Sequence, residues 1–317
     1  MSEEVFRADR DGITDAEWQE LLAQASGDGR QFFSENQLYL LYARNKVKVT
    51  RYIARRGVIG LFMIVVGLAT WVYALKADWG LTLVLGIAVT LTGVGLVGTG
   101  VVTRREPASR EKVARWLSQW TAARETPNLI AEATLSSAGA EYIPAQVACL
   151  VIVERDQLLD LLLKNAAHSA LSSLVVAESG YPAALASEAR RLLEARADLK
   201  VIAVHDATAR GTAMLARLQS SSVFPLSQRP ILDAGLFPAD VLWLAELAPA
   251  IPAAHTNSVP LDSLSFESLL LGLRGVCRGA LSLYAAIEAA RSGEVTGQSE
   301  VRATNGQPSA RAGQPLS

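Results

Sequence analysis

Two long apolar runs without a charged residue constrain this chain more than any other feature. Residues 58–75 read VIGLFMIVVGLATWVYAL, and residues 79–102 read WGLTLVLGIAVTLTGVGLVGTGVV. Each run is long enough to cross the roughly 30 Å hydrocarbon layer of a bilayer as a helix. Because only residues 76–78 separate them, the sequence predicts a tight antiparallel transmembrane hairpin over residues 57–103.

Basic residues flank the outer ends of both runs, whereas the connection between the runs holds the single Lys76. The flanking residues are Arg44, Lys46, Lys48, Arg51, Arg55 and Arg56 before the first run, and Arg104, Arg105, Arg110, Lys112 and Arg115 after the second. Positively charged flanks stay on the cytoplasmic side. The sequence thus predicts an integral protein of the inner or plasma membrane, in contact with membrane lipids, with both termini in the cytoplasm.

The second run is rich in glycine, and small residues let helix backbones approach closely in lipid. Part of this surface must serve the hairpin itself, and the remainder predicts a homo-oligomer assembled through Gly93, Gly95, Gly98 and Gly100. Neither run holds an ionisable residue in its interior. This argues against an ion or proton pathway, so the hairpin is interpreted as an anchor and an assembly device.

The polar segments divide the rest of the chain. Residues 1–56 are expected to form N-terminal helices, with a capping box that begins at Thr14, and residues 104–144 a juxtamembrane helix and linker. Residues 145–291 alternate strands with helices and predict an α/β domain with a parallel sheet. Residues 292–317 lack large apolar side chains and are predicted to be disordered.

The formal net charge of −1 argues against electrostatic binding of nucleic acid by the protein as a whole. The sequence leaves open whether a nucleic acid is a partner.

Acidic residues follow three predicted strands. Glu154 comes directly after strand 148–153, Glu178 comes directly after strand 173–177, and Asp206 follows strand 200–204 with one residue between. Because the carboxyl ends of parallel strands share one edge of the sheet, where such folds place their sites, we expect the three carboxylates to lie close together.

Four segments, taken in order, resemble the Toprim domain found in the A subunit of topoisomerase VI and in its meiotic relatives. They read LVIVE up to Glu154, ESGYP up to Pro182, HDATARG up to Gly211, and AGLFPADV up to Val241. The resemblance covers about 100 residues. It implies a Toprim-like parallel sheet, and in the family a Glu and two Asp of a D-x-D turn hold Mg²⁺.

Carried over to this chain, Glu154 matches the Glu and Asp206 the first Asp, but Thr208 stands at the second Asp position. Mg²⁺ favours hard oxygen ligands and gives up its water reluctantly, so a neutral hydroxyl there weakens the site. Glu178 is placed either to supply the third carboxylate or to stay solvated near the next helix. The metal site predicted from the resemblance is therefore Glu154, Asp206 and Glu178, with Mg²⁺ possible and no other cofactor expected.

Other candidate residues are interpreted mainly as structural. Family members that cut DNA have a separate domain with a nucleophilic tyrosine, whereas Tyr142 here is interpreted as a packing residue. His205 either tunes Asp206 or fills the strand end. Cys149 and Cys277 lie in apolar surroundings without metal-type spacing and are expected to be buried, reduced thiols.

Two functions remain in competition. The first is a membrane-anchored, oligomeric scaffold that displays a degenerate Toprim-like domain in the cytoplasm and binds a protein partner. The second is a Mg²⁺-dependent phosphoryl-transfer enzyme or nuclease at the membrane, in a defence or DNA-maintenance system. The loss of the second Asp favours the scaffold, whereas the surviving Glu154 and Asp206 favour the enzyme.

Overall fold

The computed structural model describes residues 5–6, 12–77, 80–102, 108–137, 139–248, 251 and 255–293. The predicted tail beyond residue 293 therefore lies outside the described residues. The chain forms two compact units. The helical unit comprises Met1–Leu129 with Ala245–Pro252, and the α/β unit comprises Ile130–Leu244 with Ala253–Ser317.

An aromatic core holds the base of the helical unit together. It lies among α2 (Asp15–Ala25), the first turns of α3 (Glu35–Ala77) and α5 (Arg110–Ala123), and its side chains include Phe6, Trp18, Tyr42, Trp116 and Trp120. The rings meet edge to face or stacked at centroid separations of 5.6 to 6.5 Å, which stabilises such clusters beyond area burial alone. Thr14 and Glu17 form the predicted capping box at the start of α2. A two-residue strand, β1 (Phe33–Ser34), pairs with β2 (Leu129–Ile130).

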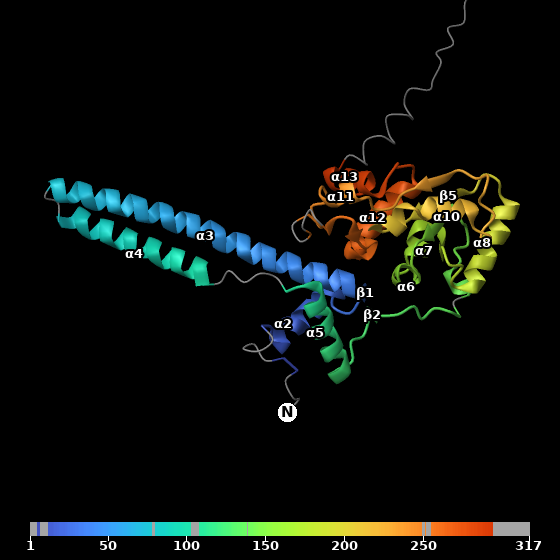
Figure 1. Ribbon diagram of the computed structural model, residues 1–317, viewed down its shortest axis with the longest axis horizontal. Coiled ribbons are helices and arrows are strands. Elements are labelled where there is room, and N and C mark those ends of the chain that lie inside the picture. Colours follow the sequence, from blue (N-terminus) through green and yellow to red (C-terminus); the bar gives the residue numbers. More distant parts are fainter. Residues whose placement is uncertain are drawn as a thin grey trace, which may run out of the picture. The chain divides into compact units, whose positions relative to one another are not determined.

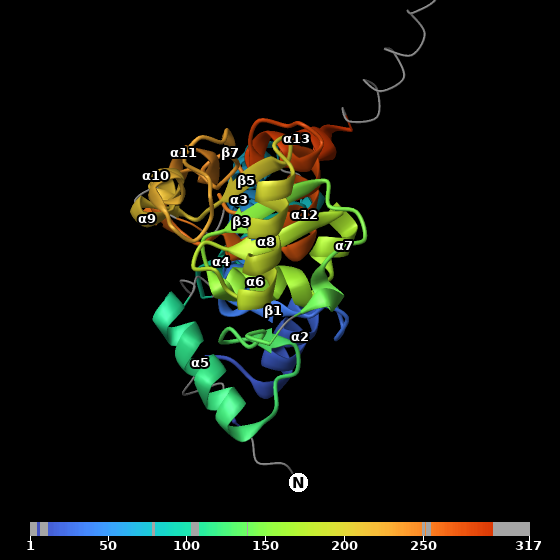
Figure 2. The ribbon, with the colours of Figure 1, turned by 90° about the vertical axis from the view of Figure 1, so that its right-hand side faces the viewer.

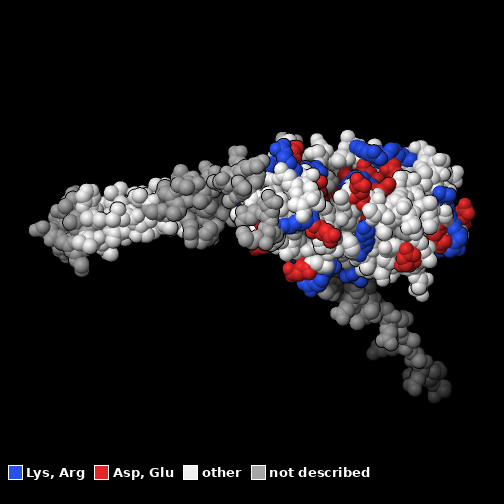
Figure 3. All heavy atoms as spheres, turned by 90° about the horizontal axis from the view of Figure 1, so that it is seen from below, with Lys and Arg blue, Asp and Glu red and all other residues white. Residues whose placement is uncertain are grey.

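The second half of α3 lies antiparallel to α4 (Gly80–Val102) in a helical hairpin (Figure 1). Close backbone approach explains the glycines here. A Cβ added at Gly67 would lie 2.7 Å from the Thr90 nitrogen, and one at Gly93 would lie 2.6 Å from the Gly60 carbonyl oxygen. Most of the exposed side chains on the described parts of the two arms are apolar, and the described atoms of the arms in Figure 3 include no charged group.

In the part of the chain that the structure describes, none of the helices has an apolar stretch long enough to cross a membrane. This finding overturns the predicted transmembrane hairpin over 57–103 and the integral-membrane location, and the orientation inferred from its flanks loses its basis.

A parallel sheet forms the centre of the α/β unit, as predicted, and it has four strands where the sequence indicated three (Figure 2). Its strand order is β4-β3-β5-β7. The strands are β3 (Cys149–Val153), β4 (Ser173–Ala177), β5 (Lys200–Val204) and β7 (Ile231–Asp233). Every residue of β3 and β4 is buried, which is typical of a sheet covered on both faces.

Helices connect and cover these strands. They are α6 (Asp156–Lys164), α7 (Ala167–Leu171), α8 (Ala183–Ala195), α12 (Phe266–Cys277) and α13 (Leu283–Ser292). Short elements complete the unit: η1 (Ala140–Tyr142), α9 (Ala209–Thr212), α10 (Met214–Ser220), α11 (Pro238–Val241), η3 (Leu261–Ser263), and β6 (Ala207–Thr208) paired antiparallel with β8 (Ser258–Val259). The turn elements after β5 therefore stand at the carboxyl edge of the sheet.

Candidate functional site

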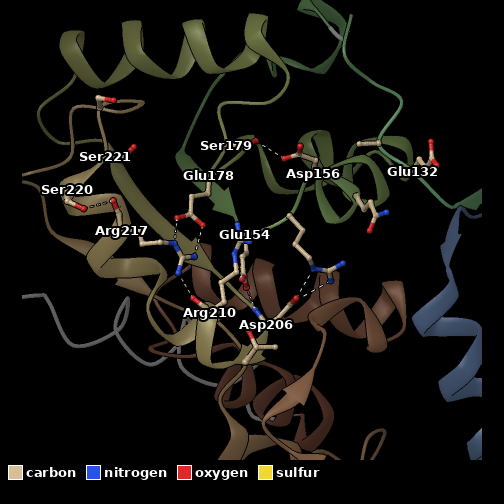
Figure 4. Close-up of a pocket in the computed structure, with 15 residues that line it drawn as sticks. Glu132, Glu154, Asp156, Glu178, Ser179, Asp206, Arg210, Arg217, Ser220 and Ser221 are labelled. Carbon is tan, nitrogen blue, oxygen red and sulfur yellow. Dashed lines mark hydrogen bonds and ion pairs between the residues drawn. The ribbon is translucent and has the colours of Figure 1, made fainter. Parts of the chain in front are cut away.

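A cleft of about 1120 Å³ opens at the carboxyl ends of β3, β4 and β5. All three carboxylates predicted from the strand ends line it, together with three arginines (Figure 4): Glu154, Glu178, Asp206, Arg155, Arg210 and Arg217. The sheet ladder fixes two of the carboxylates, because Glu154 donates its amide to the Val204 carbonyl at 3.1 Å and Glu178 donates its amide to the Val153 carbonyl at 2.8 Å. The three carboxylates expected at the strand ends thus lie in one cleft.

Arg155 links two chain segments at the inner wall of the cleft. Its Nε lies 2.6 Å from Asp206 Oδ2, and its Nη2 contacts both Asp206 and Asp262. The Leu261 amide donates a further hydrogen bond to Asp206 Oδ1 at 2.7 Å. Burial by itself lowers the pKa of Arg155, but the charges of Asp262 and Asp206 outweigh burial and raise it above its ordinary value. Asp206 is thereby committed to a structural ion-pair network.

Glu154 supports the turn that follows β5. Its Oε2 accepts the Asp206 amide at 3.0 Å, and its Oε1 lies 3.5 Å from Arg210 Nε. The turn passes so close that a Cβ at Gly211 would lie 2.1 Å from the Asp206 carbonyl oxygen and 3.0 Å from Glu154 Oε2. The glycine of the HDATARG segment is therefore required by close approach.

Glu178 forms a two-pronged ion pair with Arg217 of α10. The Nε and Nη2 atoms of Arg217 lie 2.7 and 2.8 Å from the two carboxylate oxygens. The hydrogen bond to Glu178 raises the pKa of Arg217. Both interpretations of Glu178 from the sequence, a metal ligand or a solvated carboxylate, omitted this partner.

Thr208, at the position where the Toprim pattern has a second Asp, caps α9. Its Oγ1 accepts the Gly211 amide at 2.9 Å, as an N-cap side chain does. The Thr208 hydroxyl is therefore engaged in a hydrogen bond with the backbone of the turn.

His205 lies behind the cleft wall and fills the strand end. Its Nδ1 lies 2.8 Å from the Asp206 carbonyl oxygen, its Nε2 lies 3.0 Å from Asp233 Oδ1, and its ring meets Phe237 edge to face. Burial lowers the pKa of His205, but the Asp233 carboxylate and the Asp206 carbonyl outweigh burial, so the pKa lies above its ordinary value. Of the two sequence interpretations, the geometry matches the second, since the imidazole contacts the backbone and not the carboxylate of Asp206.

The Gly-Tyr-Pro turn is held by a buried carboxylate. Tyr181 donates its hydroxyl to Asp160 at 3.1 Å, and Asp160 also accepts the amides of Thr134 and Leu135 at 2.6 and 3.2 Å. Burial and the Asp160 charge raise the pKa of Tyr181 to about 12. Tyr142 packs edge to face against His168 at 5.3 Å, in keeping with its interpretation as a packing residue.

The arrangement does not fit Mg²⁺. Each predicted ligand already contacts a guanidinium group, and a bound cation would have to displace or approach these positive charges. Among the described residues, no three side chains of His, Cys, Asp or Glu are grouped so that they could hold a metal ion. The sequence analysis did not single out the arginines, although Arg155 follows Glu154 directly and Arg210 and Arg217 follow Asp206 at a spacing of seven positions, in α9 and α10.

Comparisons with protein-family models, with curated proteins and with solved structures find no match. The class that the fold and site define is an α/β protein with a parallel sheet and an arginine-paired acidic cleft at the carboxyl edge of its strands. The resemblance to the Toprim domain stays a prediction from its four motifs.

Proposed function

We propose that this chain is a scaffold whose α/β unit binds a protein partner in the cleft, with the former metal turn of a Toprim-like domain kept as a structural element. One observation carries the proposal: all three carboxylates at the strand ends are bonded to arginine. Asp206 and Glu154 are also buried, with 4% and 5% of their surface exposed. Their charges are used to hold the edge of the sheet together.

Energetics favour binding over metal catalysis. A metal ion that bound Asp206 would draw this carboxylate away from Arg155 and leave Asp262 as the remaining acidic partner of Arg155, and weakening a buried ion pair costs stability. The three ion pairs differ in strength. The Arg210 side chain is 75% exposed and lies 3.5 Å from Glu154, so the ion pair between them is weak. Of the three arginines, Arg210 is therefore the one most available to a ligand.

The cleft favours a positively charged segment of the partner. Five carboxylates face three guanidinium groups along its walls, which leaves an excess of two negative charges. Glu132 and Asp156 are the two carboxylates without an arginine ion pair among the described contacts of the cleft, and Asp156 accepts the Ser179 hydroxyl at 2.6 Å. Complementary charge steers association and selects partners. A Lys- or Arg-rich peptide segment complements the negative charge of the cleft walls.

A titration with a defined basic peptide tests this proposal on the full chain. Hexalysine is expected to bind saturably, and the double variant Glu132→Gln/Asp156→Asn to bind about fivefold more weakly, since each exposed charge contributes up to about 1 kcal/mol. Glu188→Gln is the matched control, because Glu188 is a carboxylate paired with Arg191 outside the cleft.

Titration of the same proteins with MgCl₂ or MnCl₂ distinguishes the scaffold proposal from the alternative of a metal-dependent enzyme. The scaffold proposal expects no saturable metal binding near millimolar concentrations. Saturable metal binding that is lost in both Asp206→Asn and Glu178→Gln, together with nuclease or phosphatase activity, would establish the alternative enzyme in place of the scaffold.

Self-association through the hairpin is the second part of the proposal. The arms expose large apolar side chains, including Val58, Phe62, Leu85 and Leu91 at 61–69% exposure. Apolar surface of this kind marks an interaction site, and a second copy of the chain can cover it in a two-fold contact. Of the glycines predicted to carry the oligomer, Gly93 packs within the hairpin. Gly95, Gly98 and Gly100 lie outside the residues whose surroundings the structure describes.

Chemical crosslinking tests the hairpin contact. Phe62→Ser/Leu91→Ser is expected to reduce the crosslinked dimer about tenfold or more, because each buried side chain of this size contributes about 1.5–3 kcal/mol. Thr70→Ser, a change between hydroxyl side chains on the same arm, serves as the control. An unchanged dimer, accompanied by loss of binding to lipid vesicles in the double variant, would assign this surface to lipid and refute the contact between copies.

A further inference from the structure

Two cysteines far apart in the sequence meet at the amino-terminal edge of the sheet. Cys149 is the first residue of β3, Cys277 is the last residue of α12, and their Sγ atoms lie 3.1 Å apart. The Ser173 hydroxyl lies 2.9 Å from Cys149 Sγ and 3.7 Å from Cys277 Sγ. A disulfide bond of roughly 2.05 Å requires the sulfurs to move closer by only about 1 Å.

The contact between the sulfurs also makes the pair acidic. The hydrogen bond with Cys277 lowers the pKa of Cys149 to about 7, although burial opposes the change. The same contact raises the pKa of Cys277. The pair therefore shares one proton near neutral pH, where an ordinary free thiol is mostly protonated and unreactive.

Lys200 adds a positive charge and anchors the helix end. Its Nζ donates to the Val276 carbonyl at 2.6 Å, and its charge favours the thiolate of the neighbouring pair. Cys149 is only 1% exposed, whereas Cys277 is half-buried. A small oxidant can thus reach the pair through Cys277.

We propose that Cys149 and Cys277 are a redox-modification site that closes to an intramolecular disulfide when hydrogen peroxide oxidises it. This inference is independent of the proposed function. When the proton shared by the pair lies on Cys149, the Cys277 thiolate attacks peroxide: an S–O bond forms, the O–O bond breaks, and the leaving hydroxide takes a proton from solvent to become water. Cys149 then attacks this sulfenic sulfur, so that the S–S bond forms and the S–O bond breaks. The hydroxide released takes up the remaining thiol proton, which gives a second water.

The disulfide would fasten α12 to the first residue of the central strand. Two residues separate helix α12 from η3, where Leu261 and Asp262 hold Asp206 and Arg155 at the cleft. One helix therefore connects the cysteine pair at one edge of the sheet to the ion-pair network at the other. Oxidation restrains the segment that positions the inner wall of the cleft.

Peptide mapping of the full chain tests the proposal. After treatment with hydrogen peroxide, the folded protein is expected to lose two hydrogens and to yield one peptide that joins Cys149 to Cys277, reversibly with a thiol reductant. Cys149→Ser removes the second sulfur and is expected to stop at a sulfenic acid that a dimedone probe labels at Cys277. If the folded chain gives no joined peptide while the chain in urea is oxidised under the same treatment, the proposal is wrong.

A measurement of thermal stability shows whether the disulfide restrains the fold or forms without any effect on it. The oxidised wild type is expected to melt on the order of 5 °C higher than the reduced form, since the bond closes a long loop, and hydrogen exchange in α12 should slow. The Cys149→Ser chain should show neither change. Equal melting and exchange in oxidised and reduced wild type would overturn the restraint on α12.

Discussion

The arms of the helical hairpin and the sheet of the α/β unit are both built mainly from Val, Leu, Ile and Gly or Ala, but they bury different parts of these residues. In the sheet, every side chain of β3 and β4 is buried, and the polar chemistry lies at the strand ends. In the arms, backbones meet at Gly67, Gly86 and Gly93 while large side chains point outward. One region is held by side-chain burial, and the other by close backbone contact.

This difference means that charge should matter in one region and volume in the other. A substitution that removes a charge at the sheet edge should unfold the α/β unit without affecting the hairpin. A substitution that adds volume between the arms should do the reverse.

Arg155→Met is expected to have the largest effect. It removes the cation that lies between Asp206 and Asp262, both nearly fully buried, and an uncompensated buried charge costs about 3–5 kcal/mol. Urea denaturation followed by circular dichroism measures the loss. Arg191→Met is the matched control, since Arg191 is 66% exposed and pairs with Glu188 one helical turn away. It should change the free energy of unfolding by less than about 1 kcal/mol. Equal effects of the two changes would show that the sheet edge does not depend on Arg155.

Gly93→Leu is expected to have an intermediate effect, confined to the hairpin. A Cβ there would lie 2.6 Å from the Gly60 carbonyl oxygen and 2.8 Å from Ile64 Cγ1, so the arms must separate at a cost of about 1–3 kcal/mol. Faster hydrogen exchange over residues 58–73 reports the separation. Val94→Leu, next in sequence and 53% exposed, should leave exchange unchanged. Unaltered exchange in Gly93→Leu would contradict the packing of the arms.

The pH dependence from His205 is expected to be the smallest effect. Because the folded protein holds the pKa of His205 above its ordinary value of 6.5, protonated His205 stabilises the fold. This contribution is fully present below about pH 6.5 and is lost as the pH rises through the folded-state pKa. The facing groups are the Asp233 carboxylate, the Asp206 carbonyl and the more distant Glu154 charge.

The difference in melting temperature between wild type and His205→Gln, measured from pH 5 to 9, isolates this contribution from other titrating groups. The difference should shrink as the pH rises. A difference that grows with pH would show that the imidazole is neutral in the folded protein.

The sequence supported the sheet and its edge better than the site's chemistry. Strand ends could be predicted because parallel strands buried on both faces are short, continuous apolar runs, and an acidic residue directly after such a run must lie at the edge. The pairing of Glu178 with Arg217 could not be predicted from the sequence, because it depends on how α10 turns back over the strand end. The link from Arg155 to Asp262 likewise joins residues 107 positions apart, and no local pattern specifies such a pair. For the apolar runs, composition alone predicted membrane spans, and the described helices did not bear this out.

The long separation between Arg155 and Asp262 also orders events during synthesis. Strands β3, β4 and β5 are complete once residue 204 has left the ribosome, and local contacts form early because they close short loops. Arg155 has both of its acidic partners only after η3, which contains Asp262, has been synthesised. A nascent chain that pauses between these points holds a formed sheet with an unfinished edge, which is the kind of partly folded state that chaperones recognise.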